Sequence, residues 1–243
     1  MALQARNQGG VRQEGESFFV SMTDMLVGML FMFIIIIMFF AMKFNEAAVK
    51  KNEVVENITN SEEIRAKILQ DIKQAMSDKG VTVVIDLENG ILRLPEEILF
   101  ERNKSILSQR GQDAVATLSK ALTHVLPCYT ATAGPECGTN KHQVESVFVE
   151  GHTDTDGDDT LNWNLSFQRS LSTYQFLQGA NSELASLKNR NGQVILSLSG
   201  YGKQRPLNSN RTPEEKAQNR RIDIRFIMST PKAVDLQAEG IGK

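Results

Sequence analysis

The stretch FFVSMTDMLVGMLFMFIIIIMFFAM, residues 18–42, decides how the chain is organised. Its clearly polar side chains are Ser21, Thr23 and Asp24. As a helix it extends about 37 Å at about 1.5 Å per residue, enough to cross a hydrocarbon core of about 30 Å. A signal peptide has a shorter apolar region of about 7–15 residues, followed by a small-residue cleavage site. The stretch therefore predicts one uncleaved transmembrane helix.

The charges that flank this helix do not fix its orientation. Basic residues occur on both sides, at Arg6, Arg12, Lys43, Lys50 and Lys51. The positive-inside rule is therefore ambiguous or even adverse for an N-terminus in the cytoplasm. A short arm, residues 1–17, before a large C-terminal domain is still compatible with that orientation.

Asp24 is the unusual residue of the apolar stretch. It lies about 9 Å inside the first apolar residue, where a carboxylate costs at least about 2.5–3.5 kcal/mol on insertion scales. Helical spacing places Ser17, Ser21, Asp24 and Gly28 on one stripe, suited to close packing and to a proton or cation path. The alternative is an interfacial carboxylate at the mouth of the bilayer. One helix cannot enclose a path, so an ion-carrying Asp24 requires oligomerisation and a second membrane protein.

Residues 43–80 predict a helical linker. Ile64, Ile68, Ile72 and Met76 recur every four residues, which is the period of one helix face. Asn60 with Glu63 is a capping-box pattern for a helix start, and Gly80 suits a helix end. The apolar face could pack on its own domain, form a dimer seam or act as a gating segment, and the pattern leaves these roles open.

Residues 81–229 predict one α/β domain, because strand and helix patterns alternate within about 150 residues. Helical periodicity covers Gln112–Leu126 and Asn164–Leu177, and a third helix starts at Pro213. The expected strands are VTVVIDL, ILRL, VESVFVE, VILSLSGY and IDIRFIM, at 81–87, 91–94, 144–150, 194–201 and 222–228. We expect residues 230–243 to be a C-terminal tail. The whole chain is a single N-terminal transmembrane α-helix followed by a C-terminal α/β (α+β) domain.

Charge and cysteine content exclude some functions and suggest one bond. The 243 residues carry 27 Lys+Arg and 29 Asp+Glu, a formal net charge of −2. No excess positive field exists for general nucleic-acid binding. Cys128 and Cys137 flank a loop short enough to close with a disulfide, and free thiols are the alternative. A zinc site is not expected here, because the segment has no CxxC-type spacing and the nearby His124 and His142 do not complete a ligand set.

The densest polar motif is GHTDTDGDDTLNWNLSFQRS, residues 151–170. It follows an expected strand and enters an expected helix, where donors and side chains converge on ligands. Asp154 could hold an ammonium group and Arg169 a carboxylate, with amide contacts from Asn162. A calcium loop built on aspartates 154, 156, 158 and 159 lacks the Glu expected at its twelfth position. His152 has no placed nucleophile beside it, so we expect no enzymatic activity. The incomplete calcium loop leads us to expect no metal, and we expect no cofactor.

This motif resembles the peptidoglycan-binding domain of the OmpA-like family. GHTD, Gly157, Asn162, LS at 165–166, Arg169 and NRR at 219–221 fall at the family's spacing, over about residues 81–229. The resemblance implies binding of the diaminopimelate unit of peptidoglycan stem peptides. Asp154 and Arg169 would grip its zwitterionic end, supported by Thr153, Asn162 and Arg220. Ser170 departs from the usual Ala, and the loop from about Pro127 to Gln143 looks like an insertion.

The segment SMTDMLVGMLFMF, residues 21–33, resembles the single-span B subunits of proton-driven stators, the MotB-like family. Together with the C-terminal motif and a short spacer, it is most similar to the B subunits of Zorya anti-phage defence complexes. The resemblance implies a homodimer inside a ring of a multi-span MotA- or ZorA-like partner, with Asp24 as proton carrier. It also implies a bacterial inner-membrane location, with the N-terminus cytoplasmic and the C-terminal domain periplasmic. A flagellar stator subunit and a passive cell-wall anchor are the alternatives.

Overall fold

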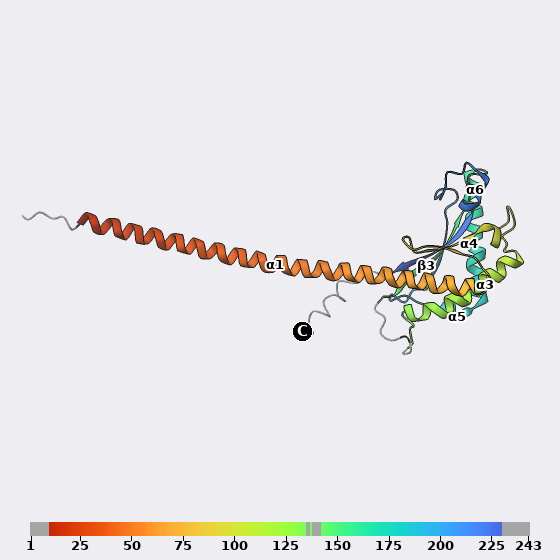
Figure 1. The fold of residues 1–243 in the computed structure, drawn as a ribbon, viewed down its shortest axis with the longest axis horizontal. Helices are drawn as coiled ribbons and strands as arrows, with labels where there is room; N and C mark the ends of the chain where they lie inside the picture. Colours follow the sequence, from red (N-terminus) through yellow and green to blue (C-terminus); the bar gives the residue numbers. More distant parts are fainter. Residues whose placement is uncertain (1–9, 135–136, 138–141, 230–243) are drawn as a thin grey trace, which may run out of the picture. The chain divides into compact units, whose positions relative to one another are not determined.

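The computed structural model describes residues 10–134, 137 and 142–229 (Figure 1). The chain divides between Glu56 and Asn57 into two compact units. The first contains most of a long helix, and the second contains the end of that helix with a five-stranded sheet and shorter helices. The predicted class, an N-terminal apolar helix and a C-terminal α/β domain, is confirmed.

Helix α1 runs without interruption over Gly10–Ser77. The side chains of residues 22–46 are exposed, and within the described chain this helix alone is long and apolar enough to cross a membrane. The capping-box interpretation of Asn60 and Glu63 is wrong, because both residues lie exposed inside the helix. The helix end is close to the predicted one: Ser77 is the last helical residue, and Gly80 follows with a φ of +72°.

The last part of α1 packs on its own domain. Ile68, Leu69, Ile72 and Met76 are fully buried in the main hydrophobic core, and Ile64 packs against that core. Of the roles left open for the apolar stripe, this contact supports packing on its own domain. The last turns of the predicted linker 43–80 are therefore part of the folded unit, since a four-residue stripe covers one face of a helix and needs an apolar partner.

The sheet has the strand order β1-β2-β5-β3-β4. Only β3 and β4 pair in parallel, and the other neighbours are antiparallel. All five strands overlap the predicted ones: β1 (Val84–Asp86), β2 (Ile91–Pro95), β3 (Val144–His152), β4 (Leu196–Gly200) and β5 (Arg221–Met228). Alternate residues of β5, such as Ile222 and Ile224, enter the core, while Asp223 between them points to the other face.

The two long helices of the domain bury different kinds of side chain: the first buries mainly apolar residues, and the second buries mainly polar ones. The long ones are α3 (Gln109–Val125) and α4 (Asp159–Ala180), both longer than the predicted segments. Three short elements have no counterpart in the predictions: α2 (Glu96–Leu99), the 3₁₀ helix η1 (Leu126–Tyr129) and α5 (Ser182–Ser186). The last helix, α6 (Pro213–Asn219), begins at the predicted residue, with the Thr212 side chain as its N-cap.

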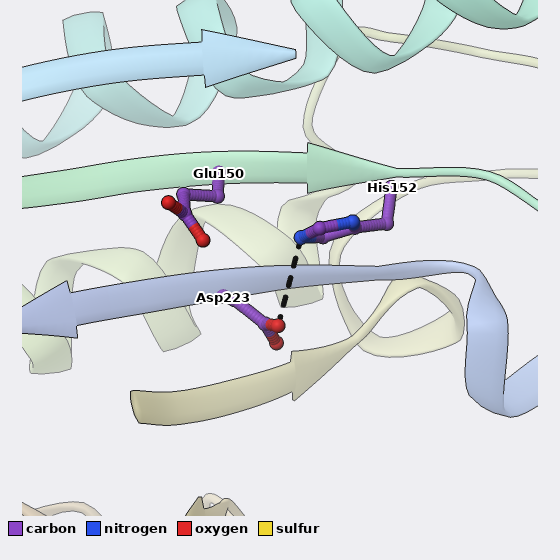
Figure 2. Close-up of side chains that lie close together, drawn as sticks. All are labelled: Glu150, His152 and Asp223. Carbon is purple, nitrogen blue, oxygen red and sulfur yellow. Dashed lines mark ion pairs between the residues drawn. The ribbon is translucent and has the colours of Figure 1, made fainter. Parts of the chain in front are cut away.

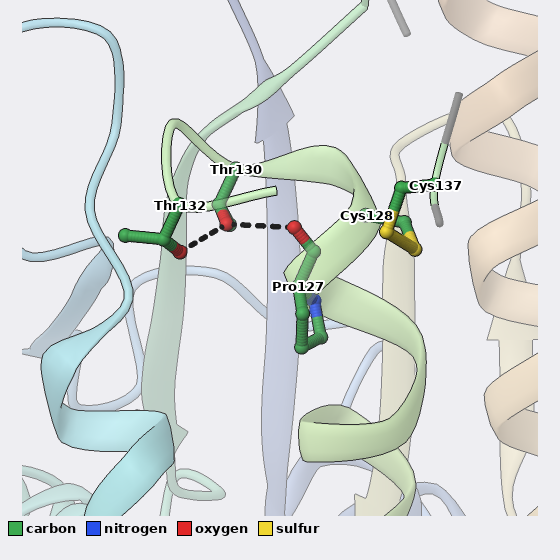
Figure 3. Close-up of a disulfide and its surroundings, with 5 residues drawn as sticks. All are labelled: Pro127, Cys128, Thr130, Thr132 and Cys137. Atoms are coloured by element: carbon green, nitrogen blue, oxygen red, sulfur yellow. Dashed lines mark hydrogen bonds between the residues drawn. A yellow bond between two sulfur atoms is a disulfide. The ribbon is translucent and has the colours of Figure 1, made fainter. Parts of the chain in front are cut away.

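Cys128 and Cys137 are joined by a disulfide (Figure 3). Cys128 belongs to η1, directly after Pro127. The Thr130 hydroxyl donates to the Pro127 carbonyl at 3.0 Å and lies 2.9 Å from the hydroxyl of Thr132, so the start of the loop is also held by hydrogen bonds.

Candidate functional site

The polar motif lies where β3 ends and α4 begins, and two glycines set how closely these elements approach. A Cβ on Gly151 would lie 2.1 Å from the Ser166 carbonyl oxygen, and one on Gly200 would lie 2.6 Å from the Phe167 nitrogen. Real Cβ atoms do not come this close to backbone, so only glycine allows α4 to press against the ends of β3 and β4. Asp158 caps α4 by accepting from the Leu161 nitrogen.

Asp154 and Arg220 form the first half of the candidate site. The Oδ2 atom of Asp154 accepts from Nη1 of Arg220 at 2.7 Å, and its Oδ1 accepts from the Asp156 nitrogen at 2.9 Å. Beside them, Asn162 is buried and donates from Nδ2 to the Asp156 carbonyl. Thr153 is buried too, and its hydroxyl has no hydrogen-bond partner within the described part of the chain.

Arg169 forms the second half and is only 2% exposed. Its Nε donates to the Lys104 carbonyl at 2.9 Å and its Nη2 donates to Oε1 of Glu96 at 2.5 Å, while its guanidinium lies over the ring of Phe100. Burial lowers the pKa of Arg169, and the charge of Glu96 opposes that shift. Its Nη1 has no hydrogen-bond partner among the residues that the structure describes.

Glu96 connects the two halves. Its Oε1 accepts from Arg169, and its Oε2 lies 2.9 Å from Nε of Arg220. Sequence reasoning missed this residue, because it comes from the first turn of α2, far from the motif along the chain. Two consecutive acidic residues after the ILRLP strand were the only available signal. Asp154, Arg169 and Arg220 thus share one ion-pair network through Glu96.

A cleft of about 580 Å³ opens beside this network. Its wall includes Arg220 and Glu96, whereas their partners Asp154 and Arg169 are buried and do not line it. The sequence interpretation gave Arg169 a direct ligand contact; in the structure its Nη1, which has no hydrogen-bond partner among the described residues, is buried. Other charged or aromatic residues of the wall are Glu97, Phe100, Arg102, Asp156, Arg211 and Lys216.

The aspartates of the motif do not converge on one point. Asp156 pairs with Lys216 and Asp159 pairs with Lys203, each at an exposed position. Asp158 caps a helix and Asp154 pairs with Arg220. Because each carboxylate has a separate cationic or backbone partner, the geometry does not favour a shared cation.

Glu150, His152 and Asp223 form a second buried cluster, and their side chains lie close together (Figure 2). Along β3 and β5 they alternate with residues of the apolar core, so they lie on the opposite face of the sheet. Nε2 of His152 lies 3.6 Å from Oδ2 of Asp223. Burial first, and then the neighbouring arginines, lower the pKa of His152 to about 2. Arg225 contacts both carboxylate oxygens of Glu150. Asp223 forms ion pairs with Arg93 and Arg221.

A divalent cation would compete with these arginines for the same oxygen atoms. The positive charges around His152 would also repel it. The cluster is therefore a structural charge network.

Asp24 lies in the apolar part of α1 and is exposed along with its neighbours. Gly28 lies one turn further on, and a Cβ there would meet nothing within 4 Å. The rest of the predicted stripe, Ser17 and Ser21, belongs to a stretch whose side chains are outside the described set.

Comparison with known proteins defines the class. Residues 137–220 match the OmpA family, a range that contains the motif of β3 and α4 and ends at Arg220. A crystal structure of a MotB-like protein from Desulfovibrio vulgaris has the same fold, with a TM-score of 0.50 and 21% identity over 71% of this chain and 98% of that one. The chain thus carries an OmpA-like domain after an N-terminal apolar helix.

Sequence similarity to individual proteins covers more of the chain than the OmpA family match does. The Zorya protein ZorB of Escherichia coli is 25% identical over 209 residues, which are 86% of this chain and 79% of ZorB. A span of that length necessarily includes part of the apolar stretch of α1 as well as the domain. The lipoprotein YiaD of Escherichia coli is 28% identical over 153 residues, 63% of this chain and 58% of YiaD.

Proposed function

We propose that this protein is a proton-conducting, stator-type subunit of the bacterial inner membrane, anchored to peptidoglycan, and that it is the B subunit of a Zorya anti-phage defence complex. The observation that carries the proposal is the combination, in one chain, of a carboxylate within a membrane-length apolar helix and an OmpA-like domain. The similarity to ZorB over most of both chains supports the defence role.

Asp24 supplies the proton site in this proposal. A carboxylate in an apolar medium is costly when charged, so each protonation or release changes its preferred surroundings. Two copies of the chain pair inside a ring of a multi-span MotA- or ZorA-like protein, which encloses the path that a single helix cannot. At about 2.3 kcal/mol per charge per 100 mV, the membrane potential drives rotation of the ring relative to the dimer.

The OmpA-like domain holds the dimer to the wall on the periplasmic side, and the N-terminal arm stays in the cytoplasm. Asp154 and Arg169 recognise the zwitterionic end of a diaminopimelate stem, supported by Thr153, Asn162 and Arg220. Two features support this: Arg220 faces the cleft while paired to Asp154, and the buried donors of Thr153 and Arg169 are still unpaired. The role is mechanical rather than enzymatic.

The decisive experiment is proton flux into liposomes that contain the purified complex with its multi-span partner. Asp24→Asn, which keeps size and polarity but cannot ionise, should abolish flux while the complex still assembles. The neighbouring Thr23→Ala is the matched control and should retain flux. Normal flux through an assembled Asp24→Asn complex would refute the proton-carrier role. No flux in the wild-type assembly, even after deletion of residues 43–56, the part of the predicted linker outside the folded unit, would favour a passive anchor.

Binding of wall fragments tests the anchoring half separately. Asp154→Ala and Arg169→Ala should each weaken retention of the full-length protein on purified peptidoglycan. Unchanged retention of both variants would reject this site. A flagellar stator subunit, the other alternative, is distinguished by whether motility or phage resistance is lost on deletion of the gene.

A further inference from the structure

The carboxylate of Glu96 occupies a position between two arginines that a ligand carboxylate could otherwise take. Oε1 accepts from Nη2 of Arg169, and Oε2 lies 2.9 Å from Nε of Arg220. Its backbone nitrogen also donates to the Arg220 carbonyl at 3.1 Å, which fixes the start of α2 against that residue. The Glu96 side chain is 8% exposed and forms part of the cleft wall.

Glu96 also balances the charge of the site. Asp154 and Glu96 contribute two negative charges, and Arg169 and Arg220 contribute two positive ones. Without Glu96 the group would carry one excess positive charge and would attract any carboxylate. With Glu96 in place, a lone anion gains attraction from two arginines that are already paired and meets repulsion from two carboxylates.

Two hydrogen-bond donors in the site are nevertheless unpaired within the described part of the chain and could bind a ligand oxygen. Nη1 of Arg169 and the hydroxyl of Thr153 are both buried and have no hydrogen-bond partner within the described residues. An entering carboxylate can use these donors only if something compensates its charge. An ammonium group on the same ligand end, next to Asp154 and Glu96, provides that compensation.

We infer that Glu96 is a specificity-determining residue of this cleft: it restricts binding to stem ends that carry an ammonium and a carboxylate together, and it excludes ends that carry a carboxylate alone. The inference rests on the proposed peptidoglycan binding and adds a third charged residue to the pair expected from the motif. In this inference the residue that excludes ligand ends with a carboxylate alone belongs to α2, which lies outside the motif of β3 and α4.

The test compares three synthetic stem tripeptides, L-Ala-γ-D-Glu-diaminopimelate, by calorimetry with the full-length protein in detergent. One has the free zwitterionic end, one has its distal amine acetylated, and one has its distal carboxylate amidated. Wild type should bind the zwitterion best. Glu96→Gln should shift the ratio of acetylated to zwitterionic affinity by roughly tenfold toward the acetylated stem, and should weaken binding of the amidated stem.

Glu214→Gln is the matched control, because Glu214 is an exposed acidic residue in the first turn of α6 and is not part of the cleft wall. It removes the same formal charge and should leave the three affinities in their wild-type order. Glu96→Asp keeps the charge and should also keep that order. An unchanged ratio in Glu96→Gln, or an equal shift in Glu214→Gln, would overturn the role of Glu96.

Thermal unfolding provides a second measurement if Glu96→Gln is too unstable for calorimetry. Loss of the carboxylate leaves Arg169 buried without its counterion, so a bound acetylated stem should raise the melting temperature of this variant more than that of wild type. Equal rises would contradict the inference. Failure of wild type to bind any of the three stems would overturn the wall anchoring itself, whereas normal binding with unaltered preferences overturns only Glu96.

Discussion

Helix α1 contains two apolar stretches, and they differ in whether their side chains are exposed or buried. Around Ile35 and Ile36 large side chains are exposed on every side of the helix. Around Ile68 and Ile72 the apolar residues recur every four positions and are fully buried in the domain core. Secondary structure is therefore the same in both, and the distribution of polar residues around the helix determines the surroundings. A helix that is apolar all round suits lipid, and a one-sided helix suits a protein core.

The largest test of this comparison replaces one isoleucine in each stretch. Ile72→Ala should lower the free energy of unfolding of the domain by about 2–5 kcal/mol, because it leaves a cavity in a closed core. Ile35→Ala, the same chemical change at an exposed position, should change it by less than about 0.5 kcal/mol. The fluorescence of Trp163, the single tryptophan, reports unfolding of the domain in detergent. Similar losses in both variants would show that the two stretches are not distinct environments.

A change of pH should affect the stability of the folded domain but not that of the exposed part of α1, and the effect should be smaller than that of Ile72→Ala. His152 has a folded-state pKa of about 2, against about 6.5 in an unfolded chain. Between these values the unfolded state binds the extra proton, so stability is greatest above about pH 6.5 and falls as pH decreases. The loss due to this residue is at most about 1.4 kcal/mol per pH unit.

His152→Gln should reduce that slope, measured by denaturant unfolding between pH 7 and pH 5. His124→Gln changes an exposed histidine in the last turn of α3 and serves as the control. Helicity of the exposed part of α1 should not follow the His152-dependent change, since the histidine lies in the other unit. Parallel slopes for wild type and His152→Gln would contradict a neutral, buried His152.

Local patterns in the sequence predicted most elements of this fold. Alternation in IDIRFIM and in VESVFVE gave β5 and β3, because one face of each strand must enter the core. The resemblance assigned Asp154 and Arg220 to one binding site, and the two side chains form an ion pair in the structure; their role in binding stays a prediction. The bridging role of Glu96 could not be predicted, because the contact to Arg169 joins positions 73 residues apart and no local pattern encodes it.

The burial of Arg169 and the continuity of α1 were missed for related reasons. Arg169 has the right spacing for a ligand contact, but spacing does not reveal that Glu96 and Phe100 cover it. At Asn60 a helix-start pattern occurs inside a long run that lacks proline. Extending an existing helix by one residue costs less than nucleating a new one, so a capping pattern alone does not interrupt it.

The smallest predicted effect concerns this junction between the two stretches. Asn60→Ala should change the free energy of unfolding by no more than about 0.5 kcal/mol, and in the stabilising direction, because alanine is the better residue inside a helix. If Asn60 capped a new helix, the same substitution would cost about 0.5–2 kcal/mol. Ser108→Ala is the positive control, since Ser108 caps α3 by accepting from the Gly111 nitrogen. Equal losses in the two variants would mean that α1 is two helices, and the apolar stretch would then join the domain through a break rather than through continuous helix.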